Sequence, residues 1–101
     1  MYQKPDDMKS EALVLKEIIK AFVEGRLSVA EFERDYMEEY KEALFLSHEE
    51  YLILETFFGW VDAYRPDCPP DEESRDQITE ATLRKHAATA VAKLDALLLK
   101  S

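Results

Sequence analysis

Two short segments, LSVAEF at residues 27–32 and LSHEEY at residues 46–51, carry the same helix-start pattern. In each segment a serine precedes a glutamate by three positions, which is the spacing of a capping box that satisfies the first backbone N–H groups of a helix. A leucine before the serine and an aromatic residue after the glutamate have the spacing of a hydrophobic staple. The two segments therefore predict helices that begin next to Ser28 and Ser47.

Apolar residues recur at helical spacing along most of the chain and predict four helices. We expect these helices at about residues 10–24, 29–45, 48–64 and 80–99. Ser10 and Thr79 are the expected N-caps of the first and last helix, and Gly25 is the expected stop of the first. No segment alternates as a strand does, and the connections are short or moderate. The expected fold is therefore all-α, an antiparallel four-helix bundle that forms a single domain over residues 1–101.

The helical spacing also predicts which side chains face the core. The expected core residues are Leu15, Ile18, Ile19 and Phe22; Phe32, Tyr36, Tyr40 and Leu44; Ile53, Leu54, Phe57, Trp60, Val61 and Tyr64; and Leu83, Ala87, Ala90, Leu94 and Leu97.

Prolines at positions 66, 69 and 70 end the third predicted helix and open an acidic connection at residues 65–78. This connection also holds Cys68, the single cysteine, which has no partner for a disulfide and no CxxC spacing for zinc. The longest apolar runs are too short to cross a membrane. The first ten residues lack the apolar stretch of a secretory signal, so we expect the protein in the cytoplasm.

Acidic residues are concentrated in one region. The chain has a net charge of −9, but residues 31–80 hold sixteen acidic and four basic side chains, a net of −12, and the remainder has a net of +3. Such a surface repels nucleic acids and anionic lipid and steers a basic protein toward itself, so we expect neither direct nucleic-acid binding nor membrane binding. The alternative is an acidic solvated surface without a function.

The third predicted helix separates its rings from its carboxylates. At about 100° per residue, Glu55, Gly59 and Asp62 lie within about 60° of one another on the side away from the core, beside Tyr51. Glycine is unfavourable in a helix interior, so either a neighbouring helix or a docking partner is expected to approach closely at Gly59.

The sequence offers little support for catalysis. His48 and His86 have no second histidine or cysteine at i,i+4 spacing, no ExxH or HExxH pair occurs, and the two glycines form no phosphate loop. We therefore expect no cofactor, no metal site and no enzymatic activity, although a carboxylate-dependent metalloenzyme stays open as an alternative. A rigid face that presents carboxylates to the Arg and Lys residues of a partner is favoured.

Three blocks of the sequence carry a family resemblance: LVLKEIIKAFVEGRLSVAEFERDYM at 13–37, FGWVDAYRPD at 58–67 and ITEATLRKHAATAVAKL at 78–94. With these blocks the chain resembles the colicin D-type bacterial immunity proteins, also called the bacterial self-protective colicin-like immunity family. The VDAYRPD segment followed by the LR helix is the specific part. The resemblance implies a cytoplasmic four-helix bundle that neutralises a toxin nuclease, a tRNase in the colicin D group, by covering its basic active site with acidic residues in place of RNA. Related proteins serve contact-dependent inhibition systems.

The resemblance implies toxin contacts at Asp62, Tyr64 and Asp67. The face analysis and the loop composition add the candidate contacts Glu55, Asp71, Glu72, Glu73 and Asp76. Asp62 also has a structural interpretation, as a cap or ion-pair partner where the chain leaves the helix. The loop sequence CPPDEES departs from the plainer linker of the family, which leaves the contact geometry and the toxin's identity open. We expect a monomeric free protein, and the alternative function is an acidic adaptor or regulatory subunit that docks another basic protein.

Overall fold

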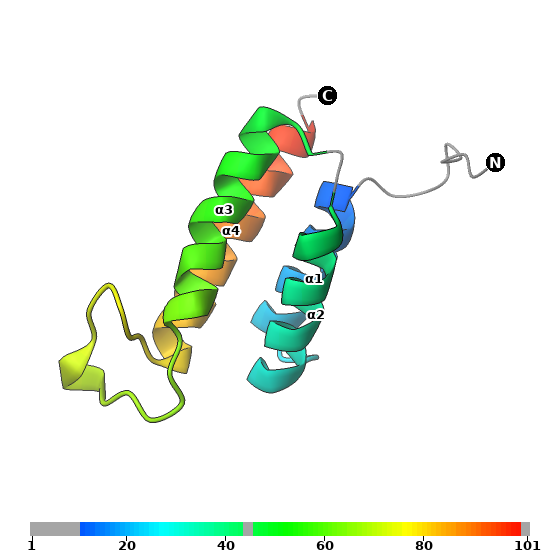
Figure 1. Ribbon diagram of the computed structural model, residues 1–101. Helices are drawn as coiled ribbons and strands as arrows, with labels where there is room; N and C mark the ends of the chain where they lie inside the picture. Colours follow the sequence, from blue (N-terminus) through cyan, green and yellow to red (C-terminus); the bar gives the residue numbers. More distant parts are fainter. Residues whose placement is uncertain (1–10, 44–45, 100–101) are drawn as a thin grey trace.

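The fold is an antiparallel four-helix bundle, as expected for an all-α chain (Figure 1). The computed structural model describes residues 11–43 and 46–99, with the backbone alone at residues 98 and 99. Its helices are α1 (Glu11–Val23), α2 (Val29–Glu42), α3 (His48–Ala63) and α4 (Glu80–Leu99), and a short 3₁₀ helix, η1 (Pro70–Glu72), lies between α3 and α4. The expected cap Ser10 and the expected core residue Leu44 lie outside the described residues.

The helix starts follow the predicted capping pattern. The Ser28 hydroxyl accepts from the Glu31 amide at 3.1 Å, and the Glu31 carboxylate accepts from the Ser28 amide at 2.9 Å. Ser47 and Glu50 repeat this exchange at 3.1 and 2.8 Å. At α4 the Thr82 amide donates to the Thr79 hydroxyl at 3.2 Å. Both capping boxes and the Thr79 cap are therefore confirmed.

Gly25 ends α1, as predicted. Its φ of +80° is in the left-handed region that favours glycine. The Arg26 amide donates to the Ala21 oxygen at 2.8 Å, and the Gly25 amide donates to the Phe22 oxygen at 3.1 Å. This pair of bonds is a Schellman motif, which turns the chain toward α2.

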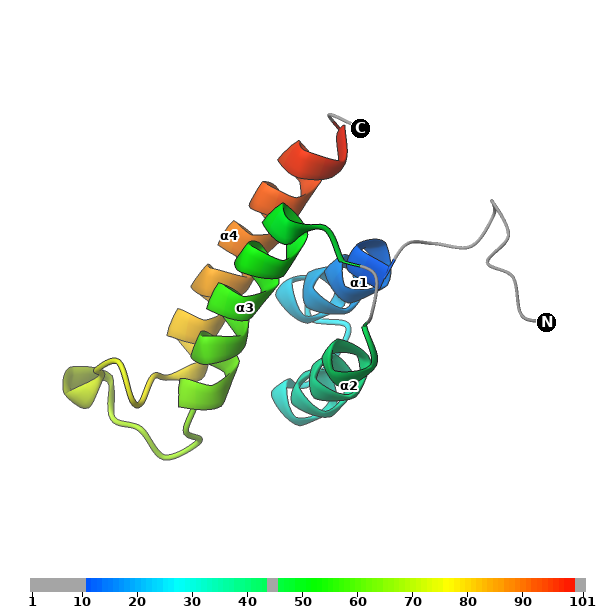
Figure 2. The same ribbon diagram turned by 45° about the horizontal axis from the view of Figure 1, so that its top comes forward.

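The helices form two hairpins, α1–α2 and α3–α4, which lie face to face with their axes inclined to each other (Figure 2). Aromatic rings fill the space between them. Phe32 of α2 stacks on Phe22 of α1, with ring centroids 4.3 Å apart. Its ring centroid also lies 5.9 Å from that of Phe57 of α3. The buried Tyr36 hydroxyl donates to the Leu54 backbone oxygen at 2.9 Å, so the one polar atom that this ring brings into the core has a partner.

Most of the predicted core residues are buried. The described ones that are only partly buried lie at the edges of the bundle, and they are Ile18, Tyr40, Ile53, Trp60, Tyr64 and Leu97. The second helix ends at Glu42, before the predicted boundary at residue 45, because Ala43 already has an extended backbone. Of the two alternatives for Gly59, a packed neighbouring helix is not found in the described structure, because a Cβ built there would meet nothing within 4 Å.

Candidate functional site

The acidic connection between α3 and α4 is a closed loop that extends beyond the end of this hairpin (Figure 1). Its two ends are joined by an isolated parallel bridge between Tyr64 and Ile78. The Arg65 amide donates to the Ile78 oxygen at 3.1 Å, and the Ile78 amide donates to the Ala63 oxygen at 3.0 Å. Because the Ile78 side chain is buried in the core, the base of the loop is fixed to the bundle.

Hydrogen bonds also organise the interior of the loop. The Gln77 side chain donates to the Glu72 backbone oxygen at 2.8 Å, and the Ser74 amide donates to the Gln77 oxygen at 2.9 Å. Glu73 reaches the start of α4, where one carboxylate oxygen accepts from both the amide and the hydroxyl of Thr79, each at 2.8 Å. Hydrogen bonding with the Thr82 and Thr79 groups lowers the pKa of Glu73. The acidic loop is therefore a preorganised surface, and Glu73 fastens it to α4.

The structure brings together most of the predicted site residues at one end of the molecule. Asp62 lies in the last turn of α3, and the exposed loop acids follow it. Within the described residues, no hydrogen bond or ion pair engages the carboxylates of Asp62, Asp67, Asp71, Glu72 and Asp76.

Arg65, a basic residue of the same loop, forms no ion pair with these acids in the described chain. Its guanidinium donates to the backbone oxygens of Asp62 at 2.7 Å and Tyr64 at 2.9 Å, at the C-terminal end of α3. A cation at this end of a helix satisfies its last carbonyl groups and complements its dipole. The Asp62 carboxylate forms no capping hydrogen bond and no ion pair in the described chain. The interpretation of Asp62 as a cap or ion-pair partner is therefore not supported by a contact.

The single cysteine, Cys68, lies near several carboxylates of the loop. The pKa of the Cys68 thiol is raised by partial burial and by the nearby carboxylates of Glu73, Glu72, Asp67 and Asp71. Four acids therefore act on one atom of the loop, which is the electrostatic environment that attracts a cationic partner.

Two of the predicted site residues stand apart from this cluster. Tyr64 is half-buried, and the pKa of its hydroxyl is raised by burial and by Glu80 and Glu33. Glu55 lies about two helical turns before Asp62, where its carboxylate accepts a hydrogen bond from the Tyr40 hydroxyl of α2. Glu55 is thus part of the α2–α3 junction, at a distance from the loop.

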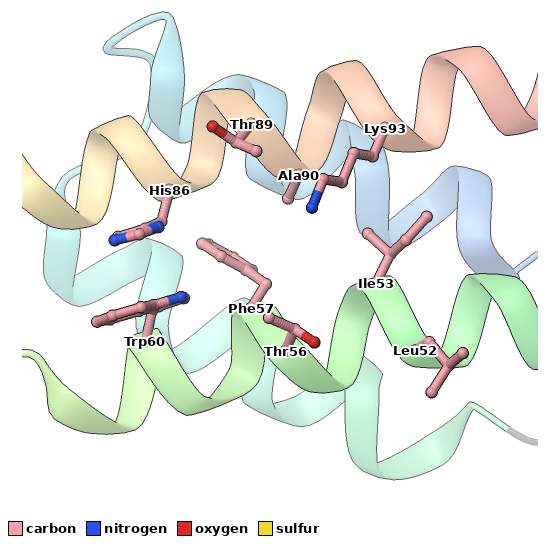
Figure 3. Close-up of a pocket in the computed structure, with 9 residues that line it drawn as sticks. All are labelled: Leu52, Ile53, Thr56, Phe57, Trp60, His86, Thr89, Ala90 and Lys93. Carbon is pink, nitrogen blue, oxygen red and sulfur yellow. The ribbon is translucent and has the colours of Figure 1, made fainter. Parts of the chain in front are cut away.

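A groove between α3 and α4 is lined by aromatic, aliphatic and basic side chains instead of carboxylates (Figure 3). It has a volume of about 520 Å³, and Phe57 and Ala90 lie between its walls. Trp60 of α3 and His86 of α4 stack on each other at one end of the groove, with ring centroids 3.8 Å apart and planes 8° apart. Lys93 also lines this groove. Its ionisable lining residues are basic, so it does not offer carboxylates to a basic partner.

Sequence reasoning missed three tertiary contacts that shape these surfaces: the bond from Tyr40 to Glu55, the fastening of Glu73 to Thr79, and the contact of Arg84 with Phe22. Of these contacts, only that of Arg84 had a signal in the sequence. Arg84 belongs to the LR pair in the block at 78–94.

The described residues offer neither a metal site nor a membrane-spanning helix. No group of three or more His, Cys, Asp or Glu side chains in residues 11–43 and 46–99 is arranged to hold a metal ion. In the same part of the chain, no helix has the length and apolar content needed to cross a bilayer.

The chain matches a known protein family over most of its length. The family model described as bacterial self-protective colicin-like immunity matches residues 11–94, from the first residue of α1 into α4, and this match contains all three blocks singled out in the sequence. Neither a curated protein nor a solved structure matches the chain.

Proposed function

This chain belongs to the bacterial self-protective colicin-like immunity family, and we propose that the toxin it neutralises is a nuclease whose basic active site is covered by acidic residues of this protein. Family membership makes the chain an immunity protein that acts on a toxin. The finer proposal is that the toxin is a tRNase of the colicin D or contact-dependent inhibition type. In that complex, carboxylates occupy the positions of RNA phosphates.

One observation carries the proposal. Five carboxylates without partners in the described chain, those of Asp62, Asp67, Asp71, Glu72 and Asp76, lie on the end of α3 and on a loop whose backbone is closed by hydrogen bonds. A surface that is ordered before binding loses little conformational entropy when it meets a partner. Charge-assisted bonds from Arg or Lys then satisfy the carboxylates, and these bonds are stronger than those between neutral groups.

The proposed contacts have different roles. Asp62, Asp67, Asp71, Glu72 and Asp76 face the cationic cleft of the toxin. Glu73 and Tyr64 contact the toxin at the base of the loop, where they also hold its shape. Glu55 forms a second contact on α3.

The same proposal includes the state of the protein in the cell. We propose a single domain over residues 1–101 that is monomeric when free, resides in the cytoplasm and inhibits by occlusion in a one-to-one complex, without catalysis of its own. Because opposite charges steer the two proteins together, added salt is expected to slow their association.

Co-expression with the cognate toxin domain, sought first in the adjoining gene, tests the function directly. We expect the cells to survive and the two proteins to purify together. An adaptor for another basic protein would give no protection against that domain, and this outcome would contradict the proposal.

The location of the interface is tested at Cys68, which can be alkylated selectively because it is the single cysteine of the chain. We expect iodoacetamide to modify Cys68 much more slowly in the toxin complex than in the free protein. The matched control is Ala96→Cys in a Cys68→Ser background, because Ala96 is exposed about 24 Å along α4 from its first residue. Equal modification of Cys68 in the free and bound protein would show that the loop is not covered.

A further inference from the structure

A second hollow, of about 400 Å³, lies between α2 and α3 at a distance from the acidic loop. Aromatic rings form much of its surface. Tyr40 of α2 and Phe58 of α3 stack with centroids 5.0 Å apart and planes 19° apart, and Tyr51 lines the same hollow with 45% of its surface exposed. Tyr51 is one of only two large hydrophobic side chains that are exposed among the described residues.

One carboxylate is held beside these rings. The Tyr40 hydroxyl donates to one oxygen of Glu55, and no residue of the described chain donates to the other oxygen. A tyrosine hydroxyl keeps its proton at neutral pH. Burial, followed by the bond to Glu55 and the proximity of Tyr51, raises the pKa of Tyr40 further. Tyr40 therefore orients the Glu55 carboxylate and leaves an acceptor oxygen exposed beside an aromatic surface.

We propose that this hollow, defined by Tyr40, Tyr51, Glu55 and Phe58, is a socket for one arginine side chain of the bound protein. A guanidinium is planar, stacks on aromatic faces and donates in a fork that matches a carboxylate. An ammonium matches the carboxylate charge but not the flat rings. An anionic group is repelled by Glu55. The inference deepens the proposed function and rests on it, since the toxin's basic surface supplies the arginine.

A lysine of this chain lies at the edge of the socket. Lys41 lines the hollow, is exposed, and forms no ion pair with Glu55 in the described structure. Its positive charge opposes the entry of a guanidinium. Lys41→Gln should therefore tighten binding more than Lys20→Gln, which removes the same charge from an exposed position of α1.

The first test needs no toxin. We expect N-acetyl-arginine amide, added to the free protein, to shift the NMR signals of Tyr40, Tyr51, Glu55 and Phe58. It should bind about two- to fivefold more tightly than N-acetyl-lysine amide, the ratio that corresponds to a cation–π contact at an exposed site. Equal shifts with both probes, or shifts spread over the acidic loop, would overturn the socket.

Variants separate the socket from general acidity. Glu55→Gln should weaken binding of the arginine probe, whereas Asp76→Asn, which removes the same charge from the loop, should leave this binding unchanged. Tyr51→Ala should weaken probe binding about two- to fivefold, whereas Tyr51→Phe should bind the probe as the parent does, because the ring face is the contact. Equal effects of Glu55→Gln and Asp76→Asn would overturn the assignment.

A second arm distinguishes failure of the socket from failure of the proposed function. In the complex with the toxin domain, Tyr51→Ala and Glu55→Gln should raise the dissociation constant more than Asp76→Asn does. If these two variants bind the toxin as tightly as the parent while the complex still protects cells, the socket is wrong and the immunity function stands. If the parent fails to bind the toxin while the arginine probe still binds, the proposed function is wrong, and the hollow binds arginine but not an arginine of the toxin.

Discussion

The guanidinium of Arg84 lies over the ring of Phe22, 4.2 Å from its centroid, and donates to the Phe22 backbone oxygen. Its remaining nitrogens donate to the Glu80 carboxylate at 3.0 and 2.8 Å. One side chain of α4 thus holds the last turn of α1, and Glu80 fixes its orientation. The LR pair in the sequence block at 78–94 therefore has a structural meaning, since Leu83 is buried and Arg84 joins the two hairpins.

Replacement of Arg84 by methionine should lower the free energy of unfolding by about 1–3 kcal/mol, because the charged hydrogen bonds and the contact with the ring are lost while the apolar stem is kept. Urea denaturation measures this change. Arg26→Met is the control, because Arg26 forms an exposed ion pair with Glu24 and its loss should cost less than about 1 kcal/mol. Equal effects of the two variants would contradict the role given to Arg84.

The sequence was sufficient to predict the parts of the fold that depend on neighbouring residues. Ser28 with Glu31, and Ser47 with Glu50, act over three positions, so their spacing alone predicted the helix starts. Arg84 and Phe22 are 62 positions apart, and no local pattern links them. The same holds for Tyr40 with Glu55 and for Trp60 with His86, whose contacts arise only when the helices pack.

The composition of the candidate site could be predicted from the sequence, but its arrangement could not. The acidic character of residues 65–78 was visible, whereas the closure of this loop was not, because the bridge of Tyr64 to Ile78 involves only backbone groups. Side-chain identity carries little information on such bonds. The Glu73 bond to Thr79 was hidden for a related reason, since an acid six residues before a cap fits no standard capping pattern.

Gly59→Ala should make the protein more stable and a weaker inhibitor. Gly59 lies within α3, and an added Cβ meets nothing within 4 Å, so alanine should raise the free energy of unfolding by about 1 kcal/mol. A partner that approaches this face closely would be held off by the methyl group.

Urea denaturation and toxin titration measure these two effects. Ala88→Gly, at an exposed interior position of α4, is the reciprocal control, with stability lowered by about 1 kcal/mol and toxin affinity unchanged. Unchanged toxin affinity in Gly59→Ala would rule out close approach at this position.

Acidification should destabilise the α3–α4 hairpin through His86. Burial lowers the pKa of His86 below its usual 6.5, although Glu73 acts in the opposite direction. The unfolded chain therefore takes up a proton before the folded chain does, and stability falls as the pH drops below the unfolded value.

Urea midpoints at about pH 7.5 and about pH 5.5 should differ more for the parent than for His86→Phe, which keeps a ring on Trp60 and removes the titration. The emission of Trp60, the single tryptophan, reports the same event, because its ring lies 3.8 Å from that of His86. A parent and variant with the same pH dependence would show that this histidine titrates alike in the folded and unfolded chain.

Glu73 should support the loop only when it is ionised. Its folded-state pKa lies below the ordinary value of 4.5, so its stabilising effect is present above that value and is lost as the pH falls through the folded pKa. Glu73→Gln should therefore destabilise the protein near neutral pH and reduce its sensitivity to acid. Asp76→Asn removes a loop carboxylate without a partner in the described chain and should leave both properties unchanged. Thermal unfolding, followed from neutral pH to below the ordinary pKa of 4.5, would reveal whether the two variants differ.

Charge reversal at the end of α3 tests the central claim most directly. Asp62→Lys combined with Asp67→Lys places two cations on the proposed toxin-binding surface, where neither native carboxylate has a partner in the described chain. Glu24→Lys combined with Glu38→Lys makes the same change in net charge at exposed positions outside the loop. The measurement is the inhibition of RNA cleavage by the toxin domain, with circular dichroism to check that both variants stay helical. The account predicts that the Asp62 and Asp67 variant loses inhibition while the control keeps it, and full inhibition by the reversed Asp62 and Asp67 variant would contradict it.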